Sequence, residues 1–316
     1  MIKSVAFGAR STADQVLAGI DLSGKRFVVT GCNSGMGLET MSALAANGAE
    51  VIGLARTLQS AQQACREVAF NCIPMECDLG DFDSIASAVD AIGQMSGTID
   101  GIVANAGIAR LATLHTRYGV ELQFLVNHIG HFALINGLTG RLRDGSGRVV
   151  LISSSASQRQ APAEGVMFDN LAGQRFYDPA LFYGQSKLAN ALYASELARR
   201  LRGRGIAVNA ADPGAVRGTG LMQHLGWPLR WLHTLASPFL KSPPQGAATA
   251  ALLAASPGAN GVSGEYWADC RPAQGSPLLQ DTALAARLWE LSEQVLSRHT
   301  ATLDDAVPPA GIHRAA

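Results

Sequence analysis

The chain has 316 residues, a length that suits one large α/β domain or two small ones. Hydrophobic residues make up 47% and charged residues only 16%, which argues against a disordered protein. Basic and acidic residues balance at 25 each, and no basic run indicates nucleic-acid binding. No apolar run suits a spanning helix, no secretory signal is visible, and five cysteines argue against a disulfide framework. We therefore expect a cytoplasmic protein without a transmembrane segment.

Apolar runs of strand length alternate with longer segments of helical periodicity. The predicted strands are Phe27–Thr30, Glu50–Ala55, Cys72–Cys77 (interrupted by Pro74), Ile99–Ala104, Arg148–Ser153 and Ala207–Ala211. The predicted helices are Gly35–Asn47, Gln59–Ala69, Asp81–Met95, Gly119–Leu138, Asp178–Leu201 and Asp281–His299. Because parallel strands need crossover connections, this order predicts an α/β fold: a single-domain, Rossmann-type doubly wound parallel sheet with helices on both faces.

The ends of the chain and one internal segment depart from this alternation. We expect an N-terminal extension over 1–23, the Rossmann-type domain over 24–299 and a loose tail over 300–316. The segment 216–244 breaks the rhythm and is predicted to form a substrate lid, although a subunit interface or peripheral membrane contact would also use its apolar side chains. These side chains are Leu221, Met222, Leu225, Trp227, Leu229, Trp231 and Leu235.

A glycine-rich turn joins the first predicted strand to the first predicted helix. Glycines permit a tight turn and close approach to a pyrophosphate, and the following helix N-terminus favours negative charge. The position between a strand and a helix makes this pattern more specific than a glycine cluster alone. The turn therefore predicts a dinucleotide site that includes Gly31, Asn33, Ser34, Gly35, Met36 and Gly37.

Residues after the next three strands are candidates for the rest of that site. Arg56 follows the second strand, where an arginine accommodates the 2′-phosphate of NADP; the alternative is a solvated loop residue. Asp78, next to Leu79, is expected either to bind the adenine amino group or to begin a helix. After the fourth strand, small residues would let the backbone approach the cofactor, and an asparagine could tie strands together, in Asn105, Ala106 and Gly107.

Tyr183 and Lys187 form the candidate catalytic pair. They lie four residues apart in a predicted helix and therefore share one face. A neighbouring ammonium is expected to lower the pKa of the phenol, so that Tyr183 exchanges a proton with a carbonyl or alcohol oxygen, while Lys187 also binds the nicotinamide ribose. The strand that ends in Ser153, Ser154 and Ser155 would supply a hydroxyl to stabilise charge on that oxygen.

Together these motifs resemble the short-chain dehydrogenase/reductase family, over roughly 24–269. The order is a T-G-x-x-x-G-x-G turn, Asp78, N-A-G, Val126-Asn127, the serine strand, Y-x-x-x-K and Pro213-Gly214. Finer features are similar to the retinol dehydrogenase/WW-domain oxidoreductase branch, and light-dependent protochlorophyllide reductases are similar in outline. These features lie in 127–132, 186–190, 264–267 and 286–292.

The resemblance implies roles for further residues. It makes Asn127 the holder of a water in a proton relay with Lys187, and Ser154 the family's serine by its register after the apolar strand. It adds cofactor contacts from Pro213, Gly214, Val216 and Thr219. Two departures are visible: the glycine turn has no basic residue, which weakens the NADP preference, and Gly218 occupies the usual threonine position. The same branch indicates a structural role, not metal binding, for His128 and His131.

We therefore expect an NAD(P)(H)-dependent oxidoreductase that acts on a small apolar alcohol, aldehyde or ketone, with NADP(H) preferred, NAD(H) possible and no metal. A homodimer or homotetramer is the expected assembly, because relatives commonly form them. The alternatives are a non-catalytic dinucleotide-binding scaffold or sensor, and a light-dependent tetrapyrrole reductase. The presence of the tyrosine, lysine and serine disfavours the first, and only light-dependent turnover would support the second.

Overall fold

The computed structural model describes residues 7–68, 70–217 and 240–306, with side chains described as far as residue 299. Eight strands form one sheet in the order β10-β9-β8-β7-β4-β1-β2-β3, and every neighbouring pair is parallel except β9 with β10. The strands are β1 (Arg26–Thr30), β2 (Glu50–Ala55), β3 (Cys72–Glu76), β4 (Gly101–Ala104), β7 (Arg148–Ile152), β8 (Ala207–Asp212), β9 (Tyr266–Ala268) and β10 (Arg271–Pro272). The predicted doubly wound fold is confirmed.

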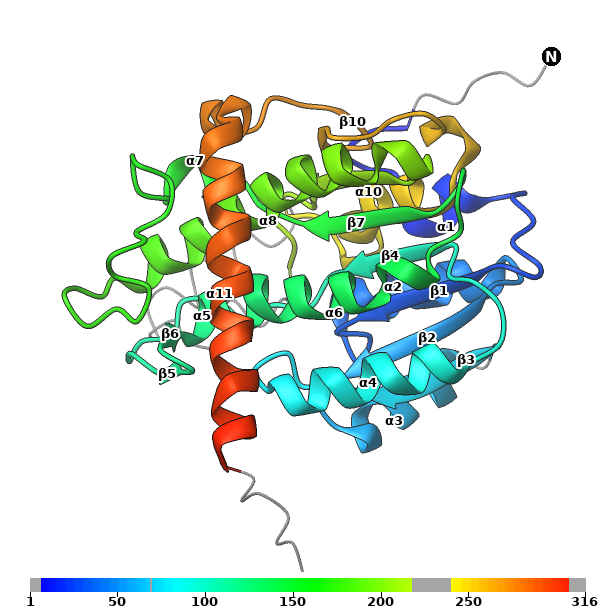
Figure 1. Ribbon diagram of the computed structural model, residues 1–316. Helices are drawn as coiled ribbons and strands as arrows, with labels where there is room; N and C mark the ends of the chain where they lie inside the picture. Colours follow the sequence, from blue (N-terminus) through cyan, green and yellow to red (C-terminus); the bar gives the residue numbers. More distant parts are fainter. Residues whose placement is uncertain (1–6, 69, 218–239, 307–316) are drawn as a thin grey trace, which may run out of the picture.

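Helices cover both faces of the sheet (Figure 1). One face carries α4 (Phe82–Gln94), α6 (Gly130–Leu138) and α8 (Pro179–Leu201), and α11 (Thr282–Ala306) crosses over α6 and α8. The other face carries α2 (Gly35–Ala46), α3 (Leu58–Val68) and α10 (Pro243–Ala255), with α1 (Ala13–Leu17) packed against α2 and α10.

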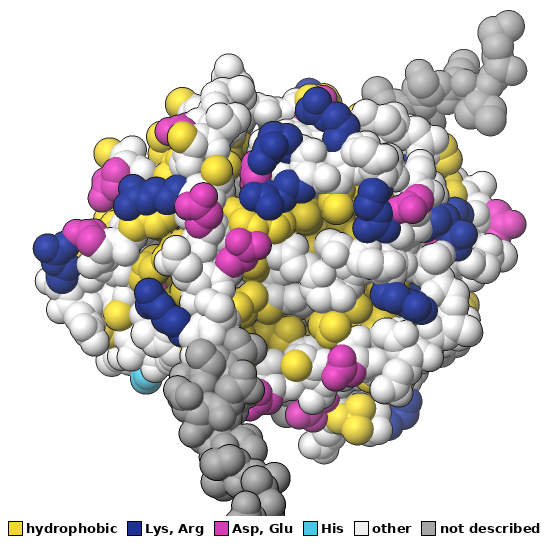
Figure 2. Space-filling view, in the orientation of Figure 1, with side chains coloured by type: hydrophobic (Ala, Val, Ile, Leu, Met, Phe, Trp, Pro, Cys, Tyr) yellow, Lys and Arg dark blue, Asp and Glu magenta, His cyan; other side chains and the backbone are white. Residues whose placement is uncertain are grey.

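Two hydrophobic cores result from this arrangement, because side chains alternate across each strand. In β1, Val28 joins the core beneath α4, α6, α8 and α11, whereas Phe27 and Val29 join the core beneath α1, α2, α3 and α10. All five cysteines are free. Basic and acidic side chains are interspersed on the face that carries α11 (Figure 2). None of the described helices combines the length and apolarity that crossing a membrane requires.

The structure differs from the sequence expectations in several elements. The helix predicted over 119–138 begins later, at Leu122, because β6 (Val120–Glu121) precedes it. From there α5 (Leu122–Phe124), a π-helix, η1 (Leu125–Ile129), and α6 follow one another without a break. Pro74 does not interrupt β3, because β3 is an edge strand and tolerates the missing N–H donor. α11 continues to Ala306, past the predicted end at His299, and α10 already begins inside the predicted lid, at Pro243.

The topology brings the carboxyl ends of β1 and β4 together. From β1 the chain builds outward through β2 and β3, whereas β4 begins the other half of the sheet beside β1. This reversal of strand order is where doubly wound proteins bind ligands, outside the carboxyl edge of the sheet. The residues that follow β1 and β4 are therefore the first to consider as a functional site.

Candidate functional site

The glycine turn packs tightly against the end of β4. Gly31 adopts a left-handed conformation (φ +66°), and a Cβ there would lie 2.9 Å from Ala106 Cα. A Cβ on Gly37 would lie only 2.1 Å from Gly31 O, so the turn has no room for a side chain at either position. Ser34 precedes α2 without a side-chain hydrogen bond to its backbone, and α2 has no acidic residue in its first turn. The first N–H groups of α2 are thus unopposed by a carboxylate and can bind an anion.

Thr30 links this turn to β4 and to α6. Its Oγ1 accepts hydrogen bonds from Asn105 N and Ala106 N, each at 2.9 Å, while Asn105 Nδ2 donates to Thr30 O at 3.0 Å. His131 lies on the other side of the hydroxyl, with Nε2 at 2.9 Å from Oγ1 and Nδ1 at 2.8 Å from Asn127 O. The predicted role of Asn105 as a tie between strands matches these contacts.

The tautomer of His131 follows from its partners. Burial lowers its pKa to about 4, so the ring is neutral at physiological pH. Asn127 O can only accept, which places the proton on Nδ1 and leaves Nε2 to accept from the Thr30 hydroxyl. His128 is also buried, with Nε2 at 3.1 Å from Ser292 Oγ on α11. Both histidines therefore make structural hydrogen bonds, and no metal-binding cluster of three or more His, Cys, Asp or Glu exists among the described residues.

The predicted adenosine-side residues lie at the ends of β2 and β3. Arg56 directly follows β2, is exposed, and forms no ion pair with any other part of the described chain. Asp78 Oδ1 accepts from Gly80 N at 2.9 Å, and Leu79 is buried. The residue that caps α4 is Asp81, whose carboxylate accepts from Asp83 N and Ser84 N. Asp78 is therefore not the helix cap that the sequence left open as an alternative.

Tyr183 and Lys187 project from the second and third turns of α8. The helix starts with the Asp178 carboxylate accepting from Leu181 N, and Pro179 occupies its first turn, both strong start signals. Tyr183 and Lys187 are buried, and Lys187 Nζ lies 5.8 Å from the centroid of the Tyr183 ring. Nζ donates to Ile152 O, at the end of β7, at 3.1 Å. The predicted pair is thus brought to the carboxyl edge of the sheet.

Asn127 reaches the same place from the π-helix η1. Its amide bonds both backbone groups of Ile108, accepting from N at 2.8 Å and donating to O at 2.9 Å, and Nδ2 also donates to Ser186 Oγ at 2.9 Å. A Cβ on Gly107 would lie 3.2 Å from Asn127 Oδ1 and 3.3 Å from Lys187 Nζ. Gly107, Asn127 and Lys187 therefore meet at one point. The wider turn of a π-helix is common at functional sites.

The three serines after β7 have different environments. Ser153 is buried, and its Oγ donates to Lys187 O at 2.8 Å, which ties β7 to α8. Ser154 is half-buried, accepts from Ala156 N at 3.2 Å, and hydrogen bonds the phenol of Tyr183. Ser155 is the residue before the short helix α7 (Ala156–Arg159). Of the three hydroxyls, that of Ser154 is the one that acts on the phenol of Tyr183.

Burial dominates the electrostatics of the pair. Burial and the charge of Asp212 raise the pKa of Tyr183 to about 12, although its hydrogen bond to Ser154 and the charge of Arg110 act in the opposite direction. This differs from the expected lowering by Lys187, because the loss of hydration outweighs the effect of neighbouring charge. Burial also lowers the pKa of Lys187 to about 8, against the effect of Asp212. The phenol of Tyr183 is therefore neutral at physiological pH.

Sequence reasoning missed two charged residues near the pair. Asp212 ends β8, and its carboxylate accepts from Gly214 N at 2.8 Å and from the Tyr266 hydroxyl at 3.1 Å. The position of this carboxylate directly before the Pro-Gly motif is the sequence signal that could have identified Asp212. Arg110, three residues after Gly107, was missed because nothing in its local sequence distinguishes it from a solvated loop residue.

The remaining predicted contacts lie beyond β8. Pro213 is buried, and Gly214 adopts a left-handed conformation (φ +76°). Val216 pairs with Lys241, and a Cβ on Gly246 would lie 2.6 Å from Val216 Cγ2 and 2.8 Å from Met36 Sδ. Val216 and Met36 therefore flank the start of α10 together. Thr219 and the predicted lid residues, which are Leu221, Met222, Leu225, Trp227, Leu229, Trp231 and Leu235, lie outside the described residues.

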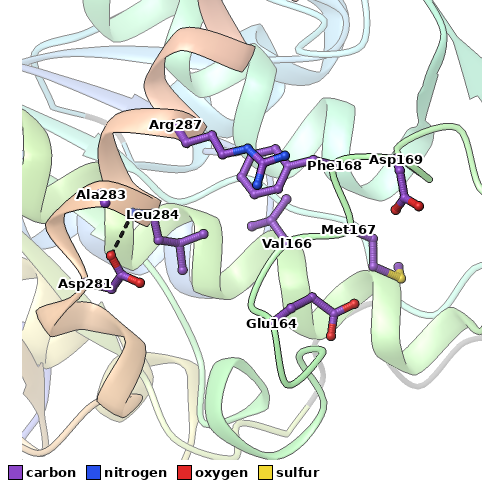
Figure 3. A pocket seen from close by; sticks show the side chains of 9 residues that line it. All are labelled: Glu164, Val166, Met167, Phe168, Asp169, Asp281, Ala283, Leu284 and Arg287. Carbon is purple, nitrogen blue, oxygen red and sulfur yellow. Dashed lines mark hydrogen bonds between the residues drawn. The ribbon is translucent and has the colours of Figure 1, made fainter.

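A surface pocket of about 470 Å³ lies apart from these residues, between 164–169 and the start of α11 (Figure 3). The Arg287 guanidinium stacks over the Phe168 ring, with 3.9 Å from Cζ to the ring centroid. None of the predicted cofactor or catalytic residues lines it.

Comparison with known proteins matches residues 25–168 to the short chain dehydrogenase family. Retinol dehydrogenase 14 from Homo sapiens is 37% identical over 293 residues, covering 86% of each chain. A probable oxidoreductase from Streptomyces lividans is 38% identical over 308 residues, covering 88% of this chain and 99% of that one. The chloroplastic short-chain dehydrogenase TIC 32 B from Brassica napus is 34% identical and covers 90% and 93%, so a cytoplasmic location stays a prediction.

A solved structure supports the same relationship. The crystal structure of a putative uncharacterized protein from Mycobacterium paratuberculosis aligns with a TM-score of 0.71 and 32% identity, covering 87% of this chain and 94% of that chain. The structural similarity therefore extends over most of the chain.

Proposed function

We propose that this chain transfers hydride between a nicotinamide dinucleotide and an apolar alcohol or carbonyl compound. The premise is that the chain belongs to the short-chain dehydrogenase/reductase family, in its retinol dehydrogenase-like branch. The observation that carries this proposal is the convergence of four side chains at the carboxyl edge of the sheet. These are Tyr183 and Lys187 from α8, Ser154 after β7, and Asn127 from η1.

The residues at the end of β1 fit a dinucleotide. Side chains on Gly31 or Gly37 would fill the turn, and the N-terminus of α2 offers unopposed N–H groups to a pyrophosphate. The same pyrophosphate would contact Asn33, Ser34, Gly35 and Met36. The adenine would lie beside Asp78 and Leu79. The rest of the cofactor would contact Asn105, Ala106, Gly107, Pro213, Gly214, Val216 and Thr219. When bound, the nicotinamide would supply or accept the hydride.

The proton step is assigned to Tyr183. In reduction its neutral hydroxyl donates a proton to the carbonyl oxygen as that oxygen gains charge, and Ser154 donates a hydrogen bond to the same oxygen. Lys187 has three N–H donors and uses one on Ile152 O, so two remain for the ribose and for stabilising the phenolate left on Tyr183. Asn127, whose amide is fixed by Ile108, holds a water that relays the proton with Lys187.

NADP(H) is the preferred cofactor in this proposal because Arg56 is exposed at the end of β2 and makes no ion pair with another described residue. A guanidinium there suits the 2′-phosphate that distinguishes NADPH from NADH. NAD(H) remains usable if the ribose contacts alone give enough affinity.

The test is a titration of the purified protein with NADPH and NADH, followed by nicotinamide fluorescence. Arg56→Ala should weaken NADPH binding about 10–100-fold and leave NADH binding nearly unchanged, because the lost contact is charge-assisted and specific to the phosphate. Arg66→Ala, at an exposed arginine on α3, is the charge-matched control. Equal losses for both cofactors would contradict the role of Arg56, and binding of neither cofactor would contradict the proposal as a whole.

Turnover in the dark separates this proposal from the two alternatives. A non-catalytic scaffold or sensor would bind the dinucleotide without consuming it, and a tetrapyrrole reductase of the photochemical type would need light. Oxidation of NADPH by an apolar aldehyde in the dark would exclude both the non-catalytic scaffold and the light-dependent reductase.

A further inference from the structure

Arg110 lies in the loop after β4, beside the catalytic pair. Its main chain adopts a left-handed conformation (φ +53°), which is unfavourable for a residue with a Cβ. The backbone is held there because Arg110 N donates to the buried Gln123 side chain. The preceding residue, Ala109, packs in a small buried cluster with Ala156 and Tyr183. The loop is therefore anchored directly against the catalytic tyrosine.

The guanidinium of Arg110 is only partly satisfied. The Gln160 side-chain amide has one orientation in which both its oxygen and its nitrogen find a partner. In that orientation the oxygen accepts from Arg110 Nη2 at 2.8 Å, and the nitrogen donates to Ala180 O at 3.2 Å. Arg110 Nε is buried and has no acceptor. No carboxylate among the described residues lies within ion-pair distance of this side chain. A half-buried cation with one neutral partner is costly unless another group binds it.

The partners of Arg110 also place it beside the start of α8, the helix that carries Tyr183. Gln160 follows α7, contacts Ala180 in the first turn of α8, and lies within 3 Å of where a Cβ on Gly184 would be. Tyr183 is the residue before Gly184. The charge of Arg110 acts against the burial that raises the pKa of Tyr183, as expected of a neighbouring cation.

We propose that Arg110 binds a carboxylate on the substrate, so that the compound reduced or oxidised at Tyr183 is an apolar carbonyl or alcohol that carries an acidic group away from the reacting carbon. A guanidinium presents planar paired donors that match a carboxylate, and burial around it strengthens the contact. This inference rests on the proposed oxidoreductase function and narrows its substrate class from neutral apolar compounds to apolar oxo acids or hydroxy acids.

The test compares matched acids and esters as substrates. One pair is para-formylbenzoate and its methyl ester, and the other is a long-chain ω-oxo fatty acid and its methyl ester. Within each pair the aldehyde group is the same, and the ester replaces the carboxylate charge by a neutral methyl ester. With NADPH and a kcat/KM assay, Arg110→Met should reduce the ratio of acid to ester turnover by about 10–100-fold, mainly through a higher KM for the acid. Arg110→Lys should restore part of that ratio.

Arg202→Met is the control, because Arg202 is exposed beyond the end of α8 and the substitution changes the net charge equally. Its acid-to-ester ratio should equal that of the unaltered protein. If Arg110→Met lowers acid and ester turnover by the same factor, Arg110 only positions the loop or tunes Tyr183, and the inference is wrong. A carboxylate preference that persists in Arg110→Met would overturn it as well.

A direct binding measurement keeps this inference separate from the proposed function. If none of the four aldehydes is turned over, the substrate assignment fails, but calorimetric titration of the two acids in the presence of NADPH still tests Arg110. Binding of the acids that is lost in Arg110→Met and retained in Arg202→Met supports the carboxylate site. Equal binding by both variants rejects it.

Discussion

Replacing Thr30 by valine should destabilise the protein far more than a single lost hydrogen bond would. The two side chains have nearly the same shape, so the change removes only the hydroxyl. That hydroxyl accepts from Asn105 N and Ala106 N and donates to His131 Nε2, all at 2.9 Å. Asn105 N has a second acceptor, Val103 O at 3.0 Å, and keeps a partner after the substitution.

Two buried or half-buried groups would then have no partner, Ala106 N and His131 Nε2. Each unsatisfied group costs about 1–3 kcal/mol, so Thr30→Val should lower the free energy of unfolding by about 2–6 kcal/mol. The control is Thr40→Val, also at a buried threonine, whose hydroxyl makes one bond to Met36 O at 2.8 Å within α2. Its loss should cost about 1 kcal/mol or less, because the carbonyl keeps its helical partner.

Urea unfolding followed by circular dichroism measures both differences. The larger loss in Thr30→Val should be accompanied by weaker dinucleotide binding, since Ala106 and the glycine turn share this network. Equal destabilisation by the two substitutions would refute the reasoning, because it would mean that the three-way contact of Thr30 has no more energetic weight than an ordinary helical hydroxyl.

Two further predictions concern the lysine and the glycine turn. Burial lowers the pKa of Lys187 to about 8, so folding must desolvate the cation below pH 8, and this cost disappears as the pH rises towards the unfolded value near 10.5. Lys187→Met should therefore raise the unfolding free energy by up to about 3 kcal/mol at pH 7 and by little above pH 10. The same substitution should abolish turnover. A gain in stability that is independent of pH would contradict this explanation. Gly37→Ala would place a Cβ 2.1 Å from Gly31 O and should weaken dinucleotide binding at least tenfold, as judged by fluorescence titration. Gly93→Ala, which meets no atom within 4 Å, should instead stabilise the helix by about 0.5–1 kcal/mol, and similar effects of the two alanines on cofactor binding would argue against a steric cause.

The parts of the fold that were predictable are those with a local signal. The strands β1, β2, β7 and β8 were predicted to within one or two residues, because buried parallel strands are continuous apolar runs bounded by turn residues. The glycine turn and the start of α8 at Asp178 were predictable for the same reason, since each carries its own backbone chemistry.

The parts that could not be predicted depend on contacts between distant segments. Nothing in the apolar periodicity of 125–129 distinguishes a π-helix from an α-helix, because both place similar side chains towards the core. His131 contacts Thr30 across 101 positions of the sequence, and Asp212 meets Tyr266 across 54. The hydrogen-bond partners of Arg110 come from α5 and from the residue that follows α7, so its place near Tyr183 is known only from the fold.

The most direct test of the proposed function is the rate at which Tyr183→Phe oxidises NADPH with an apolar aldehyde, measured beside the unaltered protein. The substitution removes only the hydroxyl, so dinucleotide binding should be retained while turnover falls by about 10²–10⁴-fold, the usual contribution of a positioned acid. Turnover close to that of the unaltered protein would contradict the assignment of Tyr183 as the proton donor, and with it the mechanism proposed for this site.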